Sequence, residues 1–104
     1  MNIYKFSFEE APAKPVLDNG VSKVVQFSFP KGKGLPKHQT TSDILVFVLQ
    51  GKIRFVAEQN EAELAAGHLV SLEKQVEHSI EALEDSVVVL VLTPSPQKHS
   101  IMKP

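Results

Sequence analysis

Short runs of β-branched and aromatic residues, separated by turn-forming residues, are the feature that most constrains this fold. The runs recur along the chain between Gly, Pro, Asn and Asp, whereas apolar residues at helical spacing are nearly absent. Patterns of this kind are typical of all-β barrels and sandwiches. We therefore predict an antiparallel β-barrel, with strands near residues 3–8, 22–29, 44–50, 52–58, 62–65, 68–72, 76–82 and 86–92.

Three segments rich in proline or glycine are expected to interrupt the strands. Pro12 and Pro15 separate the first predicted strand from a turn formed by residues 18–20. Residues 30–36 are predicted to form a long loop that leads to His38. The tail after Thr93 contains three prolines, so it cannot continue a central strand.

The length of 104 residues suits one domain, which we place at residues 1–104 with a core barrel at about 22–92. Hydrophobic residues make up 42% and charged residues 22%, so the chain can bury a core. The net charge of -1 provides no basic stripe, which argues against nucleic acid as a partner. The absence of cysteine excludes disulfides, thiolate metal sites and cysteine nucleophiles.

Membrane insertion is not expected from the hydrophobic pattern. The first residues lack a basic region followed by a long apolar stretch, and the longest later apolar run, residues 87–92, is too short to cross a bilayer. We expect a cytoplasmic protein.

Two predicted strands, residues 44–49 and 87–92, are apolar on both alternating faces. Alternation with polar residues would be expected if one face met water. One face can fill the barrel, and in so short a chain the other is expected to meet a second subunit, which predicts a homodimer. A fully covered strand in a large monomeric sandwich would have the same pattern.

Two of the four histidines, His38 and His78, lie on predicted strand faces that are otherwise apolar. His68 follows a turn and His99 lies in the tail, so both are expected at the surface. An imidazole with apolar neighbours needs a hydrogen bond or a metal, because burying an unsatisfied polar group is costly. Taken singly, each such histidine is more often a hydrogen-bonded core residue than a ligand.

The spacing of these histidines resembles the two motifs of the cupin family. The first is matched by Gly32-x5-His38-x-Thr40-x3-Ile44-x6-Gly51. The second is matched by Gly67-x5-Glu73-x-Gln75-x2-His78-x3-Ala82, after the fifteen residues that follow Gly51. The resemblance implies a jelly-roll barrel, or double-stranded β-helix. It also implies that His38 and His78 lie on adjacent strands with inward side chains, within reach of one small bridging atom.

Because the sequence departs from the motifs, it has fewer metal ligands than the family implies. Metal-binding cupins use three histidines and one glutamate, whereas Thr40 and Ile44 stand here at the second histidine and glutamate positions. Only His38 and His78 remain as metal ligands, so zinc, nickel, iron or manganese would bind weakly. Asp43 is expected to point away from His38 by strand parity. The missing Pro and Gly of the second motif should affect loop shape more than chemistry.

The first functional hypothesis is a small-molecule-binding barrel of unassigned specificity, in which a few polar anchors lie in an apolar pocket. The alternative is a metal-dependent enzyme of dioxygenase or isomerase type, in which His38 and His78 hold the metal. The third hypothesis is a structural or interaction role. Whether the protein is an enzyme is left open. Lys31, Lys33 and Lys37 are expected to be solvated. The expected ligand-binding residues are His38, Thr40, Ile44, Val46, Phe55, His78 and Ile80, with Val48 and Ile53 beside them.

Overall fold

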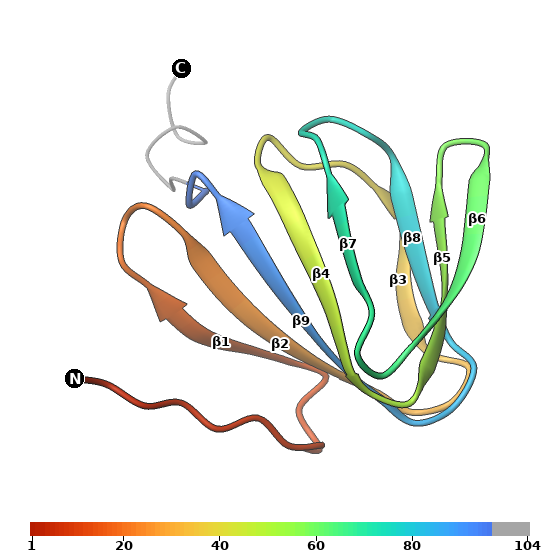
Figure 1. The fold of residues 1–104 in the computed structure, drawn as a ribbon, viewed down its shortest axis with the longest axis horizontal. Helices are drawn as coiled ribbons and strands as arrows, with labels where there is room; N and C mark the ends of the chain where they lie inside the picture. The colour runs from red at the N-terminus through yellow and green to blue at the C-terminus, as the bar shows by residue number, and fades with distance from the viewer. Residues whose placement is uncertain (97–104) are drawn as a thin grey trace.

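The computed structural model describes residues 1–96, which form nine β-strands and no helix (Figure 1). No helix within this range is therefore available to cross a membrane. The strands are β1 (Ala13–Asp18), β2 (Lys23–Phe29), β3 (Gly34–His38), β4 (Asp43–Gln50), β5 (Lys52–Ala57), β6 (Asn60–Ala65), β7 (Leu69–Leu72), β8 (His78–Ala82) and β9 (Ser86–Thr93).

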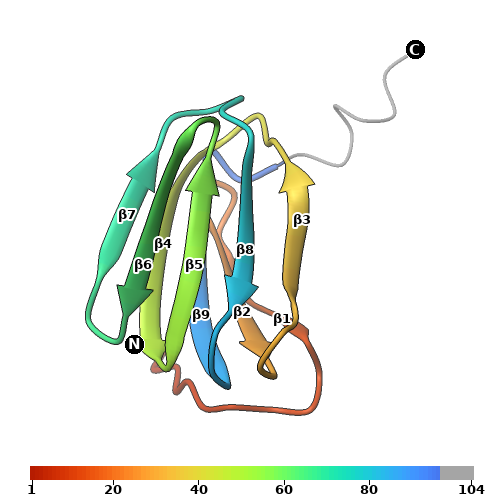
Figure 2. The same cartoon turned by 90° about the vertical axis from the view of Figure 1, so that its right-hand side faces the viewer.

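The strands form two sheets that face each other, as Figure 2 shows from the side. The five-stranded sheet has the order β1-β2-β9-β4-β7, and the four-stranded sheet has the order β3-β8-β5-β6. Every strand pair in the two sheets is antiparallel. The predicted all-β, antiparallel architecture is confirmed.

One predicted strand is absent from the structure, and two strands were missed. Residues 3–8 form no strand, while β1 and β3 lie in segments that were predicted to be turn or loop because of their prolines. Pro15 and Pro36 lie in β1 and β3, which are edge strands, and an edge strand tolerates a residue without an N–H donor. The prolines therefore mark the sheet edges rather than breaks between elements.

The core lies between the sheets and follows the period-two pattern of the strands. In β4, Ile44, Val46 and Val48 are buried while the residues between them are exposed. Val46, Val48 and Ile53 have no exposed surface at all, so the middle of the barrel is filled by side chains. The buried cluster consists of Phe29, Ile44, Val46, Val48, Ile53, Phe55, Leu64, Ile80, Ala82, Val88 and Leu90.

The outer face of the five-stranded sheet is covered over β9 but not over β4. Val87 and Val89 of β9 are 1% and 5% exposed, whereas Phe47 of β4 is 37% exposed. The N-terminal segment lies against this face of β2, where the Ser7 carbonyl accepts a hydrogen bond from Gln26 Nε2 at 2.7 Å. The two strands with apolar residues on both faces therefore differ: the outer face of β9 is buried within the chain, whereas the outer face of β4 is exposed.

A histidine pair at one end of the barrel

His38 and His78 meet at one end of the four-stranded sheet. His38 ends β3, His78 begins β8, and the two residues are direct partners in the β3–β8 pair. Their ring centroids are 4.3 Å apart, with an angle of 58° between the ring planes. His78 is 2% exposed and His38 is half-buried. The expected adjacency of the two strands is therefore present.

Gly34 allows β3 to approach β8 closely. A Cβ atom at Gly34 would overlap the carbonyl oxygen of Ile80 on β8. Any side chain there would push this part of the two strands apart. The motif spacing singled out Gly32 rather than Gly34, because it does not reveal which glycine contacts a neighbouring strand.

The backbone fixes the orientation of both imidazoles in the same way. His38 Nδ1 lies 2.8 Å from the Pro36 carbonyl oxygen, and His78 Nδ1 lies 2.9 Å from the Val76 carbonyl oxygen. A carbonyl oxygen only accepts hydrogen bonds, so Nδ1 is the donor in each ring. In the neutral ring the proton is then on Nδ1, and Nε2 carries the free lone pair.

His78 Nε2 is buried and has no hydrogen-bond partner among the described residues. Phe55 stacks against the same ring, with centroids 5.9 Å apart, and offers no polar atom. Burial lowers the pKa of His78 below its ordinary value of 6.5, and His38 acts in the same direction, while the hydrogen bond to Val76 opposes them. The site therefore favours neutral His78 with an unpaired acceptor.

Thr40 and Ile44 do not complete a metal site. The Thr40 hydroxyl donates to the Ser42 carbonyl at 2.8 Å and accepts from the Ser42 N–H at 3.2 Å, so it closes a local turn. Ile44 is 2% exposed within the core. Within residues 1–96, no three His, Cys, Asp or Glu side chains are grouped so that they could hold a metal ion. Two imidazole nitrogens do not fit the four-ligand metal that the cupin motifs imply.

Two loops are joined beside the histidine pair. The Gln75 N–H donates to the Thr40 carbonyl at 2.8 Å, and the Lys74 N–H donates to Asp43 Oδ1 at 2.9 Å. Gln75 has a φ of 67°, a left-handed conformation that favours glycine. Gln75 stands where the second cupin motif has its glycine, so the loop keeps that backbone shape with a strained residue.

The other predicted ligand-binding residues belong to the packed core. Val46, Phe55 and Ile80 are at most 4% exposed, and Phe55 makes the ring contact with His78 described above. A hollow of about 290 Å³ lies beside His78 on the side of the sheet that Val56 and Ser79 face. Its other lining residues are Lys37, Glu58, Gln59 and Glu77.

The remaining histidine and lysine predictions concern surface residues. His68 is exposed as predicted, and its Nδ1 accepts a hydrogen bond from the Ala65 N–H at 2.8 Å. His99 lies outside the described residues. Lys31 and Lys33 are exposed in the turn before β3, and Lys37 is exposed next to His38.

Comparison with known proteins identifies the class of protein that this fold and motif arrangement define. The cupin domain family matches residues 25–94, which is more than half of the chain. The chain therefore belongs to the cupin family. No curated protein matches the sequence.

Solved structures support the same fold. KdgF from Halomonas sp. is 23% identical, with a TM-score of 0.77 and 89% coverage of each chain. An RmlC-like cupin from Desulfovibrio desulfuricans is 21% identical, with a TM-score of 0.79 and coverage of 91% of this chain and 100% of that one. A cupin with a double-stranded β-helix fold from Methanocaldococcus jannaschii is 18% identical, with a TM-score of 0.78 and 96% coverage of each chain. At these identities the likeness establishes the fold alone.

Proposed function

We propose that this cupin is a small-molecule-binding protein whose polar anchor is the His38–His78 pair. The observation that carries the proposal is the buried Nε2 of His78, which lacks a hydrogen-bond partner among the described residues. Leaving a buried acceptor unpaired costs about 1–3 kcal/mol. A bound ligand that pairs with this atom would recover that free energy on binding.

The position of the pair supports binding at the end of the barrel rather than in its middle. Val46, Val48 and Ile53 are fully buried and fill the centre. At the end, the ring of His78 contacts the rings of both Phe55 and His38. A ligand there would contact aromatic surface and two nitrogen atoms, which matches the usual combination of apolar lining and few polar groups.

The metal-dependent enzyme is the weaker candidate. Catalytic zinc sites usually have three protein ligands and one open position, whereas this pair offers two nitrogens. The Thr40 hydroxyl, which stands at a ligand position of the motif, is already bonded to Ser42. A divalent metal bound by this chain would be held weakly, and its affinity would depend on pH because protonated imidazole does not bind metals.

The binding proposal is tested by NMR titration of the ¹⁵N-labelled protein with small aromatic alcohols, amides, acids and ketones. We expect imidazole signals of His38 and His78 to shift for at least one chemical class, and the shifts to vanish in His78→Phe. His68→Asn serves as the control, because His68 is exposed and makes its own bond to Ala65. Binding that persists unchanged in His78→Phe, or no shift with any class, would contradict the proposal.

We also infer that a second copy of the chain covers the outer face of β4 and β7. This face exposes 37–49% of Leu45, Phe47, Leu49 and Leu69. Asp43 is the one charged residue of β4, and β7 has none. Contiguous exposed apolar surface of this kind marks interaction sites. A two-fold axis through the face would place apolar side chains against their own copies.

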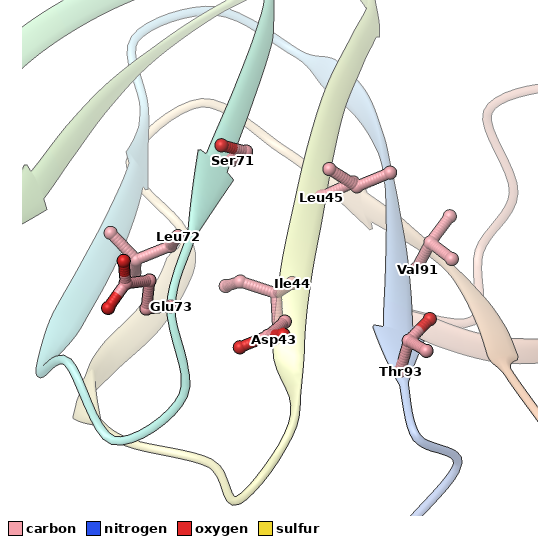
Figure 3. A pocket seen from close by; sticks show the side chains of 8 residues that line it. All are labelled: Asp43, Ile44, Leu45, Ser71, Leu72, Glu73, Val91 and Thr93. Carbon is pink, nitrogen blue, oxygen red and sulfur yellow. The ribbon is translucent and has the colours of Figure 1, made fainter.

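A hollow of about 500 Å³ extends this face toward the end of β9 (Figure 3). Leu45 and Val91 contribute apolar side chains to it, while Asp43, Glu73 and Thr93 contribute polar ones. An apolar centre with polar groups around it is the usual arrangement of protein interfaces. The hollow gives the flat sheet face a shape into which side chains of the second copy can insert.

Light scattering coupled to size-exclusion chromatography tests the dimer at micromolar concentration. We expect about twice the monomer mass of 11.5 kDa for the wild type and the monomer mass for Phe47→Lys. Val21→Lys is the matched control, because Val21 is 65% exposed but lies in the β1–β2 turn. A monomeric wild type would refute the dimer, and so would a Phe47→Lys variant that remains dimeric.

A further inference from the structure

The histidine pair presents acceptors and no donors toward a ligand. Each Nδ1–H is already donated to a backbone carbonyl, that of Pro36 for His38 and that of Val76 for His78. The remaining ring atom that can form a strong hydrogen bond is Nε2, which accepts when the ring is neutral. The backbone therefore decides the hydrogen-bonding character of both rings before any ligand arrives.

The two rings cannot satisfy each other. Two neutral imidazoles protonated on Nδ1 have lone pairs at both Nε2 atoms, so no hydrogen lies between them. Their centroids are nevertheless only 4.3 Å apart, and His78 Nε2 is buried. A third group that carries hydrogen is needed to pair with these nitrogens.

Neighbouring side chains do not supply that hydrogen. The Thr40 hydroxyl proton goes to the Ser42 carbonyl, and the Phe55 ring has no polar group. Lys37 and Ser79 carry donors and line the same hollow as His78, but neither forms a hydrogen bond with His78 Nε2. No described residue donates to His78 Nε2.

We propose that the His38–His78 pair selects ligands that present a hydrogen-bond donor, such as a hydroxyl or primary amide group, against ketones and carboxylates of the same shape. This selectivity rests on the proposed function, because it assumes that a small molecule binds at the pair. A donor group pairs with Nε2, whereas a carbonyl or carboxylate oxygen places lone pairs against lone pairs. Sites that hydrogen-bond a substrate hydroxyl or N–H reject analogues that lack it.

Two pairs of matched fragments test the selectivity of the full chain at a pH above 7. The first pair is 1-phenylethanol and acetophenone, and the second is benzamide and benzoate. Aromatic fragments are chosen because Phe55 stacks on His78. We expect the donor of each pair to bind roughly tenfold more tightly or better, and the preference to disappear in His78→Phe but to remain in His68→Asn.

The tautomers provide an independent measurement that needs no ligand. Long-range ¹H–¹⁵N spectra should report Nδ1 as protonated and Nε2 as unprotonated for both His38 and His78. An Nε2-protonated ring in either residue would overturn the selectivity even if ligands bind.

The outcomes separate the two proposals. Equal binding of both members of a pair, or tighter binding of acetophenone or benzoate, would refute donor selectivity while leaving the binding site in place. Failure of all four fragments to shift the imidazole signals would overturn the selectivity, and the broader panel of compounds would then decide the binding function by itself.

Discussion

His38 and His78 are direct partners on β3 and β8, yet their free nitrogens cannot bond to each other. Both rings donate through Nδ1 to a carbonyl two residues earlier in the chain. Both therefore keep a lone pair on Nε2 in the neutral state, and His78 keeps it in a buried place. His78 Nε2 is thus a buried, unsatisfied polar atom at one end of the barrel, and such atoms lower stability unless a ligand pairs with them.

Rebuilding the ligand set of metal-binding cupins should create a tight metal site. We expect Thr40→His combined with Ile44→Glu to raise the affinity for Zn²⁺ or Ni²⁺ by orders of magnitude, because two missing ligands are restored. Ile44 is 2% exposed, so the introduced carboxylate should destabilise the metal-free protein and metal should restore its stability.

Isothermal titration calorimetry and thermal unfolding with and without metal check this prediction. Thr40→His alone and Ile44→Gln combined with Thr40→His are the controls, since each lacks the carboxylate. No gain in the double variant would mean that the assigned ligand positions are wrong. Tight stoichiometric metal in the wild type would mean that further ligands exist.

Stability should depend on pH through His78. Burial lowers its folded pKa below 6.5, so between these two pKa values the unfolded chain binds more protons than the folded one. The free energy of unfolding should therefore be independent of His78 above about pH 7 and should fall as the pH drops through 6.5 toward the folded pKa.

Urea unfolding between pH 8 and pH 5 measures this dependence. His78→Phe should lose stability less steeply across the window than the wild type, because the titrating group is absent. His68→Asn leaves His78 in place, so this variant should keep the contribution of His78 to the slope. Identical slopes for the wild type and His78→Phe would show that His78 titrates alike in both states.

The close approach of β3 and β8 should be sensitive to one methyl group. Gly34→Ala would place a Cβ atom on the Ile80 carbonyl oxygen, and overpacking of this kind costs about 1–3 kcal/mol. It should also separate the two imidazoles and weaken fragment binding. Gly32→Ala is the control, because a Cβ there meets nothing within 4 Å and only the φ of 88° adds strain.

Urea unfolding and fragment titration of both variants give the comparison. Equal loss of stability in the two variants, with ligand binding retained in Gly34→Ala, would show that β3 can shift without moving His38.

Relief of backbone strain at Gln75 should stabilise the protein. Gln75→Gly removes the cost of a left-handed φ of 67° and keeps the N–H that bonds the Thr40 carbonyl. Glycine also increases the entropy of the unfolded chain, which opposes part of this effect. The net increase in the free energy of unfolding should be about 0.5–1 kcal/mol. Glu73→Gly in the same loop, without a positive φ, should be destabilising. A melting temperature that falls in Gln75→Gly would count against strain at this position.

Local patterning in the sequence determined much of the fold. Strand parity with His38 correctly placed Ile44, Val46 and Val48 on the face that enters the core, because successive strand residues point to opposite faces. The resemblance to the cupin motifs implied that His38 and His78 lie on neighbouring strands, as the structure has them, and it marked Thr40 and Ile44 as residues without metal-binding groups.

Only the tertiary structure decided the chemistry of the site. Whether Pro36 ends a strand or lies in an edge strand depends on which strands pair, and that pairing is non-local. The same pairing makes Gly34 a contact with Ile80, and the local backbone path aims the Pro36 and Val76 carbonyls at Nδ1. The sequence shows that the imidazoles are present. Which ring nitrogen keeps its lone pair depends on the positions of backbone carbonyls, and every residue has a backbone carbonyl, so the sequence pattern does not reveal it.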